Sequence, residues 1–166
     1  MPGVTIERAD LGMAWAVKDS FVNYVKAMND GRILLSDGAA VTNTREFYFP
    51  FKHLEQPDST SFVLHFGGEA RFSAHHGFMS VLLRHPRIEV TPDSACLSIE
   101  PEQGREWLRL AELDLPAGLT EDGVTMWDSV VTKLADAGVA TFGDSYRAGE
   151  TLSPLTVRAP ALTVAG

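Results

Sequence analysis

The 166-residue chain has only one cysteine, Cys96, and this scarcity excludes several kinds of site. One thiol cannot form a disulfide within the chain. It also cannot supply an all-cysteine zinc site, an iron–sulfur cluster or a CxxC redox pair. A chain of this length buries enough surface to fold without crosslinks. Sites that need two or more thiolates are therefore excluded within one chain.

Basic residues are also few, because 14 Lys and Arg stand against 22 Asp and Glu, for a formal net charge of −8. The chain has no Lys/Arg cluster through which counterion release could drive nucleic-acid binding. No apolar run approaches the roughly 18 residues that a membrane helix needs. Residues 1–10 lack the basic and apolar regions of a signal peptide. We therefore expect no nucleic-acid binding, no membrane span and a cytoplasmic location, or secretion if a leader was removed.

The motifs of common enzyme classes are missing as well. The sequence has no P-loop, no GxGxxG after a strand, no GxSxG elbow and no HExxH helix. Asp and Glu form no telling pair, and a triad built from scattered Ser, His and Asp residues has no support without geometry. The sequence therefore predicts a protein that is not an enzyme.

The chain has no linker, no internal repeat and no low-complexity block, so we expect one domain over residues 1–166. Its core is expected over 11–157, with a loose tail over 158–166. From Arg32 to Leu115, short apolar or alternating segments are separated by Gly and Pro. They predict a mainly β fold, with two antiparallel sheets packed as a sandwich or open barrel and two short α-helices.

The strand segments are the main basis of this fold prediction. Gly67 and Gly68 are expected to kink or bulge the chain between the segments 61–66 and 69–73. The expected strands cover 33–35, 46–49 (ending at Pro50), 61–66, 69–73, 81–84, 87–91, 95–100, 106–115 and 155–157.

The first expected helix runs from Leu11 to Met28, where apolar residues recur at the spacing of one helix face. Asp10 is its expected N-cap and Gly31 its C-terminal stop. Ser20 lies one turn before Tyr24, so their side chains share a face.

The second expected helix covers Val130 to Ala137, with Asp128 or Ser129 as N-cap and Gly138 as its stop. A loop over 141–150 follows it. Neither helix carries a catalytic motif.

Two features could carry chemistry. Tyr24 is either a core residue whose hydroxyl finds a partner at the edge, or a phenolate ligand for ferric haem iron. A free phenol has a pKa near 10, so such a ligand needs the iron's charge and a neighbouring hydrogen-bond donor. His75 and His76 form either a solvated turn or, if extended, a pair of which at most one faces a pocket.

Three motifs occur in the order typical of one family. Residues 15–25, WAVKDSFVNYV, resemble the WGVK-x-SF-x-x-Y segment of the HtaA domain, the haem-transport-associated domain of actinobacteria. Residues 68–79, GEARFSAHHGFM, are similar to its G-x-V-x-F-x-G-H-x-G-x-L segment, and Pro86-Arg87-Ile88 follows. Residues 134–154, LADAGVATFGDSYRAGETLSP, resemble its closing LT-x-x-G-x-x-x-F-x-x-Y-x-x-G-x-x-L-x-P.

The resemblance, which covers about 11–157, implies roles for five residues. Tyr24 would be the axial ligand to the iron of ferric haem b, and His75 would hydrogen-bond that tyrosine. Ser20 would contact a haem propionate, and Tyr146 would pack or stack near the haem. Phe142 would line the apolar wall. The resemblance also implies two antiparallel sheets with a few short helices.

The chain departs from the family pattern beside the histidine. Ala74 replaces the family's glycine, and His76 stands where an acidic residue is common. His76 could be a second donor, a sixth iron ligand or an alternative partner for Tyr24. Family members are usually secreted or membrane-tethered, and the absence of both signals here favours intracellular haem handling.

Together these features predict a protein that transports, buffers or hands over haem. Its expected partners are haem and the proteins that donate or accept it, and an exposed haem face could link two copies in a homodimer. One alternative is a haem-degrading or peroxidative enzyme. Another is a β-sandwich interaction module that binds no ligand.

Overall fold

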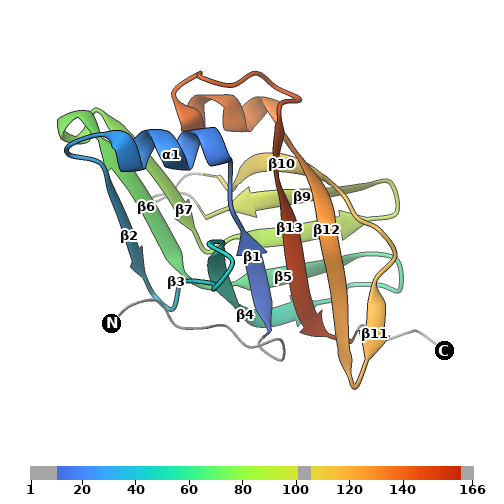
Figure 1. The fold of residues 1–166 in the computed structure, drawn as a ribbon. Coiled ribbons are helices and arrows are strands. Elements are labelled where there is room, and N and C mark those ends of the chain that lie inside the picture. The colour runs from blue at the N-terminus through green and yellow to red at the C-terminus, as the bar shows by residue number, and fades with distance from the viewer. Residues whose placement is uncertain (1–10, 101–105, 162–166) are drawn as a thin grey trace.

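Antiparallel strands dominate the computed structural model, which describes residues 11–100 and 106–161 (Figure 1). The mainly β fold class expected from the sequence is confirmed. The strands are β1 (Gly12–Trp15), β2 (Arg32–Ser36), β3 (Ala40–Val41), β4 (Phe47–Glu55), β5 (Phe62–Phe66), β6 (Glu69–Ala74), β7 (Met79–Arg84), β8 (Arg87–Thr91), β9 (Ser94–Ile99), β10 (Leu108–Asp114), β11 (Leu119–Glu121), β12 (Val124–Leu134) and β13 (Thr151–Pro160). The helical segments are α1 (Asp19–Ala27) and two 3₁₀ segments, η1 (His75–Gly77) and η2 (Asp136–Phe142).

The larger sheet closes on itself. Strand β1 pairs with β13 on one side and with β4 on the other, so Gly12 lies between Arg158 and Pro50. The closed, barrel-like order is β1-β13-β12-β10-β9-β8-β5-β4, with β3 added to β4 and β11 to β12. Closure removes most of the exposed strand edges that would otherwise pair with other chains.

A second sheet of three strands, in the order β2-β6-β7, leans away from the closed sheet. Strands β5 to β8 form one long hairpin whose outer half, β6 and β7, leaves the barrel and pairs with β2. Gly68 takes a φ of +100° at the bend, with Ala39 and Phe49 packed against its α-carbon, so a side chain there would be strained. The predicted kink at Gly67 and Gly68 is thus a change of sheet.

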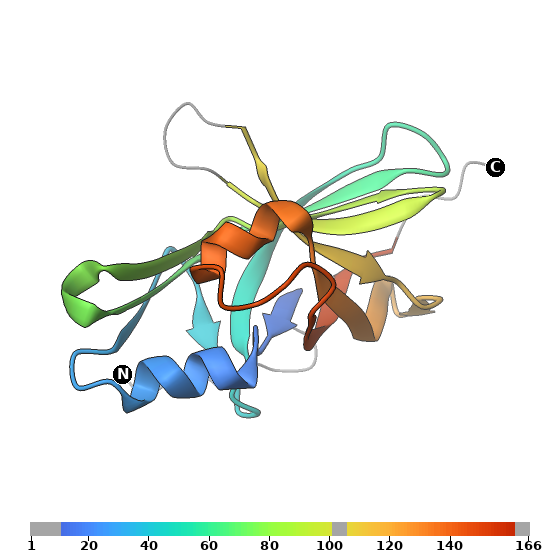
Figure 2. The ribbon, with the colours of Figure 1, turned by 90° about the horizontal axis from the view of Figure 1, so that it is seen from above.

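The bend keeps its hydrogen bonds. The N–H of His85 donates to Gly68 at 2.9 Å, and that of Phe66 donates to Pro86 at 3.0 Å. The hairpin therefore acts as a continuous arm, and its tip, η1, lies beyond the closed sheet close to α1 (Figures 1 and 2).

Aromatic side chains join the two sheets and α1 in the core. Phe72 of β6 is fully buried, with its ring centroid 5.1 Å from Phe21 and 5.2 Å from Phe47. Phe21 in turn lies 5.1 Å from Phe142 of η2. This edge-to-face chain fixes α1 between the arm and η2.

The second predicted helix is wrong, because β12 runs from Val124 to Leu134. Along it Val130, Thr132 and Leu134 are buried, whereas Val131 and Lys133 are exposed, which is the period of a strand. Hydrogen bonding to β10 and β13 outweighs the local helical spacing. The second helical segment comes afterwards, as η2.

The first predicted helix is confirmed only for its later part. Its opening residues form β1, Val17 adopts a positive φ of 64°, and α1 starts after Lys18 and ends at Ala27, one residue before the predicted end at Met28. The proposed N-cap, Asp10, lies outside the described residues.

Two other boundaries differ from expectation. Strand β4 continues through Pro50, whose carbonyl accepts from the N–H of Gly67 at 2.7 Å. The tail predicted to be loose from Arg158 is in β13 as far as Pro160, where pairing with β1 and β12 holds it and Ala159 is buried. Residues 162–166 lie outside the described range.

Candidate functional site

A groove of about 530 Å³ lies at the end of the molecule where α1, the tip of the β6–β7 arm and η2 come together. Figure 2 shows these three elements from above, with α1 (blue) at the lower left, the arm tip (green) at the left and η2 (orange) near the centre. The groove is lined by Ser20, Phe21, Tyr24, His75, Phe78, Met79, Ser80, Val81, Ala140, Thr141, Phe142, Gly143, Ser145 and Tyr146.

Tyr24 and His75 meet at this groove. Helix α1 presents the Tyr24 side chain, which is 45% exposed, toward the arm tip. Its hydroxyl lies 2.5 Å from Nε2 of His75, and the two ring centroids are 5.8 Å apart. This is the contact implied by the family resemblance, and its length is that of a strong hydrogen bond.

The turn that holds His75 is not extended backbone. His75 and His76 have φ angles of 55° and 57°, and Gly77 has a φ of 89°. The carboxylate of Asp30 accepts from the N–H of His75 at 3.1 Å and from the N–H of His76 at 2.6 Å. These backbone hydrogen bonds, first from His76 and then from His75, hold the pKa of Asp30 below its usual value.

The same turn directs His76 away from the groove. Its side chain is 90% exposed, its Nδ1 lies 3.9 Å from a carboxylate oxygen of Asp30, and it does not line the groove. The structure therefore brings Tyr24 and His75 together without His76.

A second pair of hydroxyls lies nearby. Oγ of Ser20 is 2.8 Å from the hydroxyl of Tyr146, which η2 and the following loop carry toward α1. The Tyr146 ring packs edge-to-face against Phe142, at 6.0 Å between centroids, and Phe142 is buried in the groove wall. Nζ of Lys18 lies 5.6 Å from the Tyr146 ring centre.

Five of the six site residues expected from the sequence thus line one groove: Ser20, Tyr24, His75, Phe142 and Tyr146. Sequence reasoning assigned no role to Asp30, Phe78 or Met79. Phe78 and Met79 lie within the second family motif, and Asp30 lies in the turn sequence Asn29-Asp30-Gly31 at the end of α1. Phe78 is 93% exposed at the groove, where no packing pattern would reveal it.

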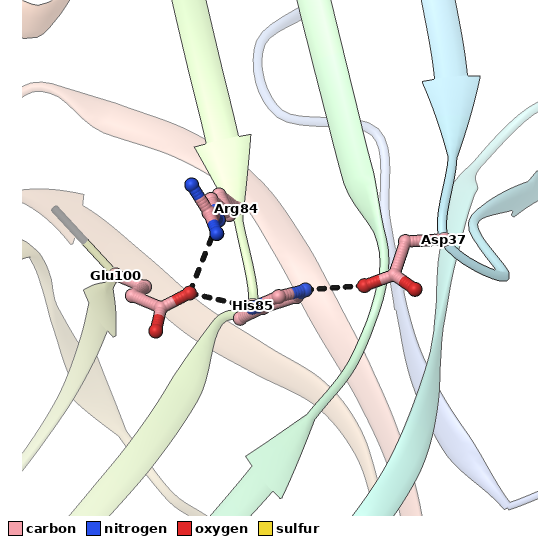
Figure 3. Close-up of polar contacts among 4 residues, drawn as sticks. All are labelled: Asp37, Arg84, His85 and Glu100. Atoms are coloured by element: carbon pink, nitrogen blue, oxygen red, sulfur yellow. Dashed lines mark hydrogen bonds and ion pairs between the residues drawn. The ribbon is translucent and has the colours of Figure 1, made fainter. Parts of the chain in front are cut away.

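A charged cluster holds the base of the arm, where β7 leaves the small sheet (Figure 3). Nδ1 of His85 lies 2.5 Å from Glu100, and its Nε2 bonds to Asp37 in the turn after β2. Arg84 contacts Glu100 at 3.1 Å. The hydrogen bond from His85 is the main cause that lowers the pKa of Asp37. His85 therefore links Glu100 and Asp37 through its two ring nitrogens.

The groove can hold a flat apolar ligand with a few polar groups. It combines aromatic and aliphatic walls with one hydrogen-bonded phenol and a hydroxyl pair, which is the make-up of small-molecule sites. No helix in the described part of the chain is long and apolar enough to cross a membrane.

Comparison with known proteins agrees with this geometry. The N-terminal domain of HtaA from Corynebacterium glutamicum superposes with a TM-score of 0.75 at 22% identity, over 96% of this chain and 100% of that one. The C-terminal domain of the same protein gives 0.71 at 22% identity, over 96% and 99%. The haem-binding protein HtaB of that organism gives 0.66 at 19% identity, over 89% and 90%.

At these identities the solved structures show a shared fold alone. No curated protein matches the chain. The model of the HtaA family, however, matches residues 10–158, nearly the whole sequence. The resemblance expected from the three motifs is confirmed, and the chain belongs to the HtaA family.

Proposed function

We propose that this chain binds ferric haem in the groove, with Tyr24 as the axial iron ligand, and that it transports, buffers or hands over haem. The observation that carries the proposal is the 2.5 Å contact between the Tyr24 hydroxyl and Nε2 of His75. Membership of the HtaA family supports it, as does the shared fold with HtaB, a haem-binding protein.

The groove residues fit haem. Haem is an apolar disc with two carboxylates, so it needs apolar walls, an iron ligand and donors at one edge. Phe21, Phe78, Met79 and Phe142 supply apolar surface, and the groove volume of about 530 Å³ is within the range of ligand pockets.

The polar residues form two groups, Tyr24 with His75 and Ser20 with Tyr146. Bound haem would supply a ferric iron, for which the phenolate oxygen of Tyr24 is a suitably hard, anionic ligand. Nε2–H of His75 would donate to the Tyr24 oxygen and orient it. The hydroxyls of Ser20 and Tyr146 would donate to a propionate.

The arrangement suits release as well as capture. Tyr24 is nearly half exposed and is the one groove residue assigned to the iron. Phenolate ligation favours iron(III) over iron(II), so reduction or a competing ligand from an acceptor protein would loosen the haem. This proposal assigns the chain no catalytic step.

The first test is a hemin titration followed by absorption spectroscopy. We expect a five-coordinate, high-spin ferric spectrum with a phenolate charge-transfer band. Tyr24→Phe should abolish this band, and His75→Gln should weaken binding by about tenfold or more, the scale of hydrogen-bond partners to metal ligands. The matched control is Tyr48→Phe, which removes a hydroxyl that donates to the Leu11 carbonyl. Equal hemin spectra for wild type and Tyr24→Phe would refute the proposed ligand.

The alternatives make different predictions. A haem-degrading or peroxidative enzyme would consume haem with a reductant and oxygen, or turn over peroxide. His76, one of the features that motivated this alternative, is exposed and does not line the groove. A ligand-free module would show no rise in melting temperature with hemin, whereas a ligand that binds only the folded state raises it.

A further inference from the structure

A second cluster of ligand-type side chains lies on the closed sheet, outside the groove. It consists of His53 and Glu55 on β4 and His65 on β5, and none of the three lines the groove. In Figure 1, β4 and β5 lie at the lower part of the closed sheet, whereas α1 and η2 lie at the top.

The strand geometry explains why these residues meet. His53 and Glu55 are two positions apart on β4, so they share one face of the sheet. His65 is directly opposite His53 in the antiparallel pairing of β4 with β5. The register shifts between Phe51 and His53, and such an irregularity re-aims the side chains that follow it.

The three side chains lie close together. The His53 and His65 rings stack with centroids 4.1 Å apart and an angle of 10° between planes. Oε1 of Glu55 bonds to Nε2 of His65 and lies 3.8 Å from Nε2 of His53. The three ligand atoms all lie within 4.8 Å of one another.

These distances are close to those around a bound metal ion. With metal–ligand bonds of about 2.0–2.2 Å, tetrahedral ligand atoms lie roughly 3.4 Å apart. The exposed side chains of His53 and Glu55, at 61% and 55%, can close the difference by rotation alone. His65 is 17% exposed and provides a more fixed anchor.

The ligand types decide the class of ion. Two imidazoles and one carboxylate form a set that Zn²⁺ uses when a fourth position is left to water or another ligand. Mg²⁺ and Ca²⁺ prefer oxygen ligands throughout. We propose that His53, Glu55 and His65 form a binding site for a divalent transition-metal ion of the Zn²⁺ class, separate from the groove.

The test uses the full chain without hemin, titrated with Zn²⁺ against a chromophoric chelator. We expect one Zn²⁺ per chain at this site. His53→Gln, Glu55→Gln and His65→Gln should each weaken it by more than about tenfold, because loss of even a partner to a ligand costs that much. The matched control is His76→Gln, which removes an exposed histidine beside the groove and should leave the affinity unchanged.

A second readout uses Co²⁺ as the probe. We expect the absorption bands of tetrahedral Co²⁺ in the wild type and in His76→Gln, and their loss in the three cluster variants. If His65→Gln lowers the melting temperature, the exposed Glu55→Gln variant decides the matter. Unchanged Zn²⁺ affinity in Glu55→Gln and His53→Gln, or loss of binding in His76→Gln, would overturn the proposal.

Discussion

The carboxylate of Asp30 accepts a hydrogen bond from the backbone N–H of His75 at 3.1 Å. The other oxygen accepts from the next N–H, at 2.6 Å, so one side chain satisfies two donors of a left-handed turn. Asp30 follows α1, which carries Tyr24, and the turn carries His75. These hydrogen bonds therefore hold the turn that carries His75 against the end of the helix that carries Tyr24, although Asp30 contacts neither of those two side chains.

Asp30→Ala tests this positioning role. It leaves two backbone donors without their acceptor, so we expect the turn to relax and hemin affinity to fall by about tenfold or more, the scale of other outer-shell losses. Asp114→Ala, on an exposed position of β10, is the charge-matched control and should bind hemin like the wild type. Hemin affinity equal in the two variants would remove Asp30 from the site.

The acid dependence of the turn follows from the same hydrogen bonds. They make the pKa of Asp30 lower in the folded protein than in the unfolded chain. The ionised carboxylate therefore stabilises the turn fully at pH values above the pKa of the unfolded chain, which is about 4. This contribution is lost as pH falls through the folded value. In a pH titration by NMR, the amide signals of His75 and His76 should show a transition below about pH 4 as Asp30 is protonated. Asp30→Asn should flatten that shift; an unchanged titration would contradict the assignment.

The hydroxyl pair provides a separate prediction. Ser20→Ala removes one partner of the 2.8 Å contact with Tyr146 and one proposed propionate donor. We expect hemin affinity to fall by about fivefold, the equivalent of one hydrogen bond of about 1 kcal/mol. Ser20→Thr keeps a hydroxyl and should retain most of the affinity. Equal losses for both substitutions would point to packing on α1 rather than to the hydroxyl.

Local patterns predicted most of the strands between Arg32 and Leu115 and the later part of α1, because both signals reside within a few residues. The region 130–137 shows the limit. Val130, Leu134 and Ala137 have helical spacing, whereas Val130, Thr132 and Leu134 alternate like a strand. Pairing with β10 and β13 decides between them, and those partners are distant in sequence. Ser129, one expected N-cap, instead has a φ of 53° where the register shifts.

The candidate site also depends on contacts between residues that are distant in sequence. The family motifs made it possible to group five residues that line one groove, which are Ser20, Tyr24, His75, Phe142 and Tyr146. Asp30 could not be assigned, because its partner His75 is 45 positions away in the chain. His85 and Asp37 are 48 positions apart, and neither belongs to a quoted motif.

The cluster at the arm base predicts coupling between stability and haem binding. His85→Gln removes the ring that links Asp37 to Glu100, so the free energy of unfolding should fall by about 1 kcal/mol. The arm should also be less firmly held, with a smaller loss of hemin affinity than for His75→Gln. The measurement is chemical unfolding of His85→Gln, Asp37→Asn and the double variant. Strictly additive effects would show that the two side chains do not interact.

Phe78 is expected to act only once the ligand is present. Its side chain is 93% exposed at the groove, so Phe78→Ser should change the stability of the free protein by less than about 0.5 kcal/mol. Haem would cover this ring, and losing that contact should weaken hemin binding by up to about thirtyfold, since fully burying an aromatic side chain is worth about 2 kcal/mol. If an exposed haem face links two copies, the amount of hemin-dependent dimer measured by size-exclusion chromatography should also decline.

Leu119→Ser is the matched control, because it removes a side chain that is 70% exposed on β11 and lies outside the groove. An equal effect of both substitutions on hemin affinity would mean that Phe78 makes no specific contact with the ligand.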